Sequence, residues 1–335
     1  MNSTVAGVLL LLAAGAMNGS FTLPMKFTKG WAWENTWLAW TLWALVLFPP
    51  TVTLATVPQL RSVYGSAPGG ALLIVIACGA GWGISQVFFG LAVDAVGIAL
   101  AFSVILGLSA AVGSLVPLIR LHPEQIFTTQ GLEVLGGVAL VLVGVGICAV
   151  AGRKREAALG QAPQKASVSR GLLYCCFSGI GSALVNFGLA FGQPLLAAAQ
   201  KLGASATWSP NAVWMPLMCA GGIPNLVYCG YLLRKNRTGN RFGSRGTTGY
   251  FLLAGLMGVF WFGSTLMYGV AAGRLGSLGT VLGWPLFMSL IVITASFWGV
   301  VTKEWKGTGA RPLQIMFAGV SVLVVAIFVL ASASR

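Results

Sequence analysis

Neutral polar and aromatic side chains recur inside the most apolar stretches of this chain, where a polar group is costly to bury. Amide groups both donate and accept hydrogen bonds, so they can pair with the hydroxyl groups of a ligand. A flat aromatic ring offers a face on which the C–H groups of a sugar can pack. This combination predicts a binding site for an uncharged polyol or sugar. The residues that we expect to line it are Asn18, Trp82, Gln86, Asn186, Gln193, Trp261, Ser264, Tyr268 and Trp284.

A structural interpretation of the same residues stays open. Serine and asparagine often tie helices together in lipid, and tryptophan often anchors a helix at the membrane surface. The sequence alone does not separate the two roles.

The acidic residues limit the other chemistry that this chain can perform. All six lie in loops or near the ends of apolar stretches: Glu34, Asp94, Glu124, Glu133, Glu156 and Glu304. Hydrolysis within a membrane needs a nucleophile with a base, or paired carboxylates, at depth. The sequence also lacks a phosphate-binding glycine-rich loop and a spaced set of metal ligands. We therefore predict no enzymatic activity, no catalytic residues, no cofactor and no metal site.

The elements that must position these residues are membrane-spanning helices. Hydrophobic residues make up 57% of the 335 residues and charged ones only 8%, far from the composition of a soluble domain. A bilayer crossing takes roughly 20 apolar residues, and the backbone must then be helical. We predict an all-α membrane protein with ten transmembrane helices. They are residues 4–23, 36–57, 70–92, 96–119, 132–151, 171–198, 211–233, 248–272, 277–301 and 312–331.

The net charge of +14 is distributed unevenly between the two sides of the membrane. The odd-numbered loops carry fifteen of the twenty Lys and Arg residues, and the even-numbered loops with the C-terminus carry five. Positive residues concentrate on the cytoplasmic side, so both termini are predicted to be outside the cytoplasm. The basic loops are then explained by the anionic bilayer surface, without a nucleic-acid partner.

The middle of the chain divides the ten predicted helices into two groups of five. We expect a first half at residues 1–152, a basic cytoplasmic linker at 153–170 and a second half at 171–335. Because five is odd, the halves enter the membrane in opposite directions, and two inverted five-helix repeats are predicted. Aligning the third helix with the eighth places Trp82 on Trp261 and Ser85 on Ser264. Trp82 and Gln86 are four residues apart and share one helix face, and Ser264 and Tyr268 share another. If the halves are homologous, these two faces are expected to meet near the bilayer midplane.

Two segments resemble the L-rhamnose–proton symporter family, which belongs to the drug/metabolite transporter superfamily. They are KGWAWENTW at residues 29–37 and KEWKGTGARP at residues 303–312. The resemblance extends weakly over the full length. It implies two inverted five-helix halves in a bacterial inner membrane, with both termini in the periplasm. It also implies import of a neutral deoxyhexose such as L-rhamnose, driven by protons.

Proton coupling requires a group that can be titrated, and the spans contain no carboxylate at mid-depth. We expect Glu133, near the outer end of the fifth helix, or Asp94, between the third and fourth helices, to carry the proton. A carboxylate at a helix end can also serve only the helix dipole. Two alternatives stay open: an uncoupled sugar facilitator, and an exporter of another small solute. The identity of the sugar and the oligomeric state do not follow from the sequence.

Overall fold

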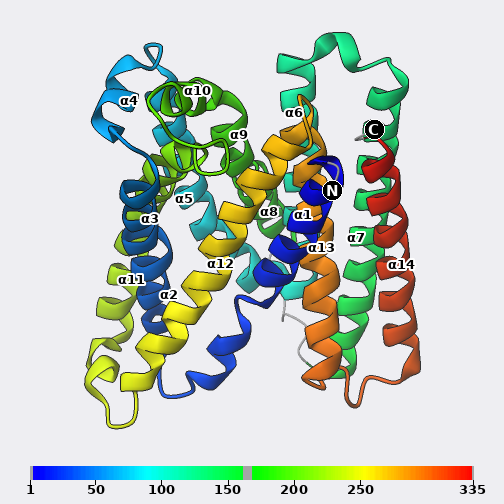
Figure 1. Cartoon of the computed structure of the whole chain (residues 1–335). Coiled ribbons are helices and arrows are strands. Elements are labelled where there is room, and N and C mark those ends of the chain that lie inside the picture. Colours follow the sequence, from blue (N-terminus) through cyan, green and yellow to red (C-terminus); the bar gives the residue numbers. More distant parts are fainter. Residues whose placement is uncertain (1–2, 161–167, 334–335) are drawn as a thin grey trace. The chain divides into compact units, whose positions relative to one another are not determined.

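The computed structural model describes residues 3–160 and 168–333, and within this part every regular element is a helix (Figure 1). Ten of the described helical segments are long and apolar enough to cross a membrane, so the predicted spans are confirmed. The segments are Ser3–Phe27, Trp33–Thr56, Ala71–Val93, Ile98–Leu121, Thr129–Ala158, Ser169–Lys201, Asn211–Lys235, Thr248–Arg274, Gly279–Val301 and Ala310–Ser332.

Several of these segments are made of more than one helix. The elements in chain order are α1 (Ser3–Ser20), η1 (Leu23–Phe27), α2 (Trp33–Thr41), η2 (Leu42–Leu47), α3 (Phe48–Thr56), α4 (Leu60–Ser66), α5 (Ala71–Val96), α6 (Ile98–Leu121), η3 (Pro123–Gln125), α7 (Thr129–Ala158), α8 (Val168–Ser182), α9 (Leu184–Phe191), α10 (Gln193–Lys201), α11 (Asn211–Asn236), η4 (Gly239–Gly243), α12 (Thr248–Arg274), α13 (Gly279–Val301) and α14 (Ala310–Ser332).

The chain forms two compact units, each built from separate stretches of sequence. The first unit contains Met1–Gly19, Ser85–Asn186 and Ala271–Arg335, and the second contains Ser20–Ile84 and Phe187–Val270. Each unit therefore takes helices from both of the predicted halves, 1–152 and 171–335. The inverted repeat itself stays a prediction.

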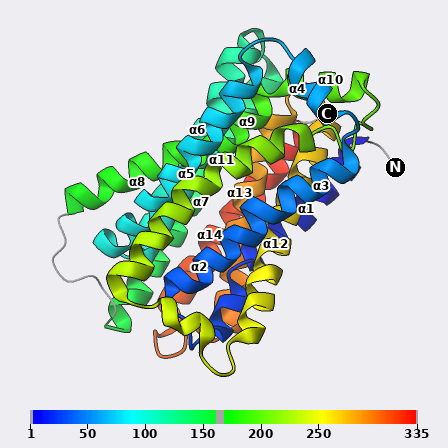
Figure 2. The same cartoon turned by 90° about the vertical axis from the view of Figure 1, so that its left-hand side faces the viewer.

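In the first unit, α7 and α14 run side by side in both views (Figures 1 and 2). Glycines on α7 permit this approach. A Cβ added at Gly137 would lie 2.5 Å from the Leu330 side chain, and one at Gly144 would lie 2.8 Å from Leu323. Close backbone packing replaces the hydrophobic effect as the attraction between helices in lipid.

In the second unit, α2, η2 and α3 form one bent span along α11 (Figures 1 and 2). The segment Leu42–Leu47 is a π-helix, and Phe48, Pro49 and Pro50 follow it. A proline has no N–H group for the carbonyl four residues before it, so the helix widens where the prolines follow.

The predicted linker at 153–170 is partly helical. α7 continues to Ala158, well past the predicted end at residue 151, and α8 already begins at Val168. At this end of α7, Arg155 pairs with Glu304 in the loop between α13 and α14, and Glu156 bonds to α6, as described below. Residues 161–167 of the predicted linker lie outside the described part of the chain.

Candidate functional site

Two tryptophans that the sequence aligned with each other meet in the second unit. The rings of Trp82 on α5 and Trp261 on α12 are stacked, with their centroids 5.3 Å apart and an angle of 22° between the planes. Trp40 on α2 meets Trp261 edge to face at 5.5 Å and 88°. The stack shows that α5 and α12 contact each other at these two rings. The meeting of the Trp82–Gln86 face with the Ser264–Tyr268 face stays a prediction.

The aromatic contacts continue along α2. The ring centroid of Trp37 lies 4.5 Å from that of Trp40 and 5.1 Å from that of Trp33, on which it is stacked. The Trp37 Nε1–H group donates a hydrogen bond of 3.1 Å to Asn225 Oδ1 on α11. We call these five rings, Trp33, Trp37, Trp40, Trp82 and Trp261, the tryptophan array. The prediction missed Trp40, although its spacing of three residues from Trp37 placed both on one helix face.

Glycines determine where Trp82 can lie. A Cβ at Gly221 on α11 would come within 2.5 Å of the Trp82 ring, and one at Gly83 would come within 2.3 Å of the Gly221 carbonyl oxygen. α5 and α11 therefore cross at nearly backbone contact, and the Trp82 ring packs against Gly221 at the crossing. Trp82 is 5% exposed, whereas Trp261 is only partly buried.

Three further predicted site residues also belong to the second unit. Tyr268, on α12, is buried, and its ring centroid lies 6.4 Å from that of Trp214. Ser264 is buried and donates a 2.6 Å hydrogen bond to the Trp261 carbonyl oxygen. Gln193 is exposed at the start of α10 and donates to the Leu189 carbonyl oxygen at 3.2 Å.

The other predicted site residues belong to the first unit. The Asn186 amide donates to the carbonyl oxygens of Gly113 on α6 at 2.7 Å and Thr280 on α13 at 3.0 Å, so it ties three helices together. Trp284 Nε1–H donates to the Ser109 carbonyl oxygen at 2.9 Å. Asn18 is buried on α1 and Gln86 is partly buried on α5. The structure thus divides the predicted residues between the two units.

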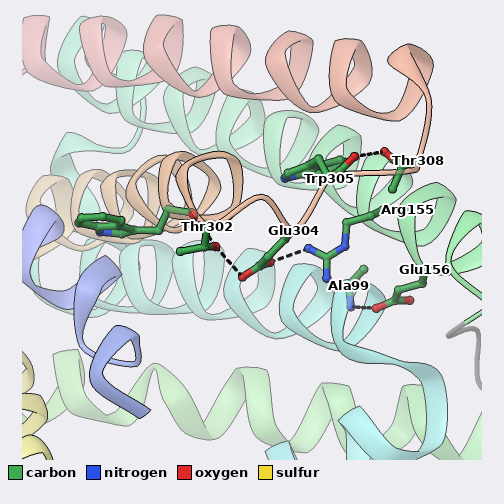
Figure 3. Close-up of polar contacts among 8 residues, drawn as sticks. Ala99, Arg155, Glu156, Thr302, Glu304, Trp305 and Thr308 are labelled. Carbon is green, nitrogen blue, oxygen red and sulfur yellow. Dashed lines mark hydrogen bonds and ion pairs between the residues drawn. The ribbon is translucent and has the colours of Figure 1, made fainter. Parts of the chain in front are cut away.

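The first unit also contains a cavity of about 230 Å³ between α6, α7 and α13. Ile98, Phe102, Val145 and Ile291 are among the residues of its apolar walls. Its polar end carries Arg155, Glu156, Glu304 and Trp305 (Figure 3). This combination of apolar walls and charged end was not predicted.

The charged groups at this end are held by specific contacts (Figure 3). Arg155 Nη1 lies 2.8 Å from Glu304 Oε2, and the guanidinium carbon lies 5.6 Å from the centre of the Trp305 ring. The Thr302 hydroxyl donates to Glu304 Oε1 at 3.3 Å. Glu156 Oε1 accepts a hydrogen bond of 2.9 Å from the main-chain N–H of Ala99. This N–H lies in the first turn of α6, where the helix itself offers it no acceptor.

Both sequence motifs that carried the resemblance thus hold loops in place. In residues 303–312, Glu304 and Trp305 connect the α13–α14 loop to the end of α7. In residues 29–37, the buried Glu34 accepts hydrogen bonds from Thr238 Oγ1 at 2.6 Å and Asn236 Nδ2 at 3.1 Å.

Comparison with known proteins identifies the family. A family model described as L-rhamnose-proton symport protein matches residues 1–334. The chain belongs to this family. Relatives named L-rhamnose-proton symporter from Citrobacter koseri, Shigella sonnei and Salmonella typhimurium are 28% identical over 332 residues, which is 97% of this chain and 96% of each relative. The family predicted from the two motifs is confirmed, and its members are multi-pass membrane transporters rather than enzymes.

A proton symporter needs a group that binds and releases the proton. The two residues predicted for this role lie on α7 and α5. Glu133 is partly buried in the second turn of α7. Asp94 lies near the end of α5, and its side chain is outside the described part of the structure. Both assignments stay predictions.

Proposed function

We propose that this chain imports L-rhamnose together with protons across the inner membrane of a bacterium. The observation that carries the proposal is the stacked pair Trp82–Trp261 inside the apolar spans of a chain that belongs to a rhamnose–proton symport family. L-Rhamnose is an uncharged deoxyhexose, and it offers both hydroxyl groups and an apolar face.

The sugar is proposed to pack its C–H face on Trp261. Trp82 covers one face of that ring and holds it in position, and Trp40 supports it edge-on. Ser264 and Tyr268 follow Trp261 by one and two turns of α12, so two hydroxyl groups lie along the same helix. Such a site needs no fixed charge, in agreement with a neutral substrate.

The orientation is proposed from the basic residues. The odd-numbered loops, which carry fifteen of the twenty Lys and Arg residues, face the cytoplasm, and both termini face the periplasm. In this orientation the cavity with Arg155 and Glu304 lies at the cytoplasmic end of the first unit.

Uptake of radiolabelled L-rhamnose by cells that express the chain tests the proposal. We expect accumulation above the external concentration and loss of that accumulation when a protonophore is added. Cells that carry an empty vector are the control. Equilibration without accumulation would indicate an uncoupled facilitator, and absence of uptake would contradict the assignment of the substrate.

A further inference from the structure

We infer that Glu304 is the carboxyl group that releases the transported proton to the cytoplasm, and that Arg155 is the side chain that drives the release. The inference rests on the proposed function, because it assigns a residue to the proton half of that symport. It differs from the prediction from sequence, which placed the proton on Glu133 or Asp94.

Arg155 and Glu304 form a close charge pair. Arg155 Nη1 and Glu304 Oε2 are 2.8 Å apart, and their side chains are 20% and 34% exposed. A guanidinium group at this distance stabilises the charged carboxylate and so expels its proton. The partial exposure of Glu304 leaves water a route by which the proton can depart.

Without Arg155, mainly apolar groups of the cavity would surround Glu304. The described charged groups among the cavity-lining residues are Arg155, Glu156 and Glu304 themselves; α6 and α13 contribute apolar side chains and the hydroxyls of Ser103 and Ser296. Lys303 and Lys306 of the same loop are exposed. The apolar walls disfavour an unpaired charge, so they favour a protonated Glu304. Separation from Arg155 would therefore make the group bind a proton, and pairing would make it release one.

The loop between α13 and α14 positions the Glu304 carboxylate. The backbone turns at Lys303, whose φ angle is 59°, and the N–H group of Glu304 donates to the Gly299 carbonyl oxygen at 2.9 Å. This turn directs Glu304 back toward α7 (Figure 3). A side chain on a short loop can change partners with a small change of the loop, whereas one within a packed helix cannot.

Glu156 supplies the matched comparison. Its partner is the main-chain N–H of Ala99 at the start of α6, which cannot withdraw as a side chain can. Glu156 is therefore expected to serve α6 as a cap and to take no part in the transfer of the proton.

The test separates coupling from transport. Accumulation of labelled L-rhamnose requires coupling to protons, whereas counterflow of labelled against unlabelled sugar does not. In Glu304→Gln, the amide oxygen can still accept from Arg155 and the amide N–H can donate to the Thr302 hydroxyl, but the group no longer titrates. We expect this variant to lose accumulation and protonophore sensitivity and to retain counterflow.

Two further variants serve as controls. Glu304→Asp, which titrates, should retain some accumulation, and Glu156→Gln should accumulate as the wild type does.

The outcomes are distinguishable. If the wild type does not take up L-rhamnose, the proposed function fails. If the wild type accumulates the sugar and Glu304→Gln does so equally, the inference fails while the function stands. Loss of both accumulation and counterflow in a normally inserted Glu304→Gln would assign Glu304 to structure only. Loss of accumulation with retained counterflow in Glu133→Gln or Asp94→Asn, but not in Glu304→Gln, would also overturn the inference.

Discussion

Trp261 and Trp82 form one stacked pair, but their surroundings differ. Trp82 is pressed against Gly221 and is 5% exposed, whereas Trp261 is only partly buried. A ring that is almost fully buried can hold its neighbour in place, whereas a ring with accessible surface can also contact a ligand. Trp261 is therefore the better candidate for direct contact with the sugar.

Replacement of Trp261 tests this difference at the level of one residue. Trp261→Ala is expected to raise the half-saturation concentration for rhamnose uptake about tenfold, equal to a loss of about 1.4 kcal/mol of binding free energy. Trp261→Phe should lose less, because it keeps an aromatic face. Trp208→Ala removes an exposed tryptophan outside the array and serves as control. Unchanged half-saturation in Trp261→Ala would contradict the proposed site.

Asn186 was predicted to line the sugar site, and its hydrogen bonds give it a structural role as well. Both amide N–H groups are donated to main-chain carbonyls, those of Gly113 and Thr280. Asn186→Ala is expected to lower the stability of the purified protein by about 1 kcal/mol, the size typical of such bonds in membrane proteins.

Thermal unfolding in detergent measures this loss. Ser321→Ala is the matched control, because Ser321 is exposed and bonds only within its own helix, to the Phe317 carbonyl oxygen. An unchanged melting temperature in Asn186→Ala would mean that these hydrogen bonds do not contribute measurably to the stability of the protein. A raised half-saturation for rhamnose would support the predicted contact with the sugar.

At the scale of elements, the crossing of α5 and α11 depends on glycine. A Cβ at Gly221 would lie 2.5 Å from the Trp82 ring and 3.0 Å from the Gly79 carbonyl oxygen. Gly221→Ala therefore forces the two helices apart or displaces Trp82, and overpacking of this kind costs about 1–3 kcal/mol. We expect a lower melting temperature and weaker rhamnose uptake.

Gly230 on the same helix provides the comparison for this prediction. No atom lies within 4 Å of a Cβ added there, so Gly230→Ala meets no neighbour. The substitution is expected to leave stability unchanged or to raise it slightly, because alanine favours the helical backbone. Equal melting temperatures of the two variants would show that the crossing tolerates a wider separation than the glycines suggest.

At the scale of the whole molecule, the orientation in the membrane can be tested with fusions. Green fluorescent protein fused after Gly243, in a loop predicted to be cytoplasmic, is expected to fluoresce. An alkaline phosphatase fused after Gly203, in a loop predicted to be periplasmic, is expected to be active. The reverse pattern at both positions would contradict the orientation derived from the basic loops.

The sixth span shows where prediction from sequence stopped. Its apolar length was predicted as one segment, 171–198, but the structure divides it into α8, α9 and α10 at Ala183 and Gly192. Pro194 marked one end of the interruption, while Ala183 carries no local signal for a break. The interruption at Ala183 lies just before Asn186, whose hydrogen bonds to α6 and α13 are contacts between segments distant in sequence.

The sequence by itself determined the ten spans, the family and the class of protein, because apolar length, loop charge and motifs are properties of consecutive residues. Only the tertiary structure decided that Trp40 joins Trp261, that Arg155 meets Glu304, and that each compact unit takes helices from both predicted halves. In lipid every span is apolar on most faces, so hydrophobic pattern does not say which face meets which neighbour. Glycine contacts and single hydrogen bonds select the partners, and these depend on residues far apart in the chain.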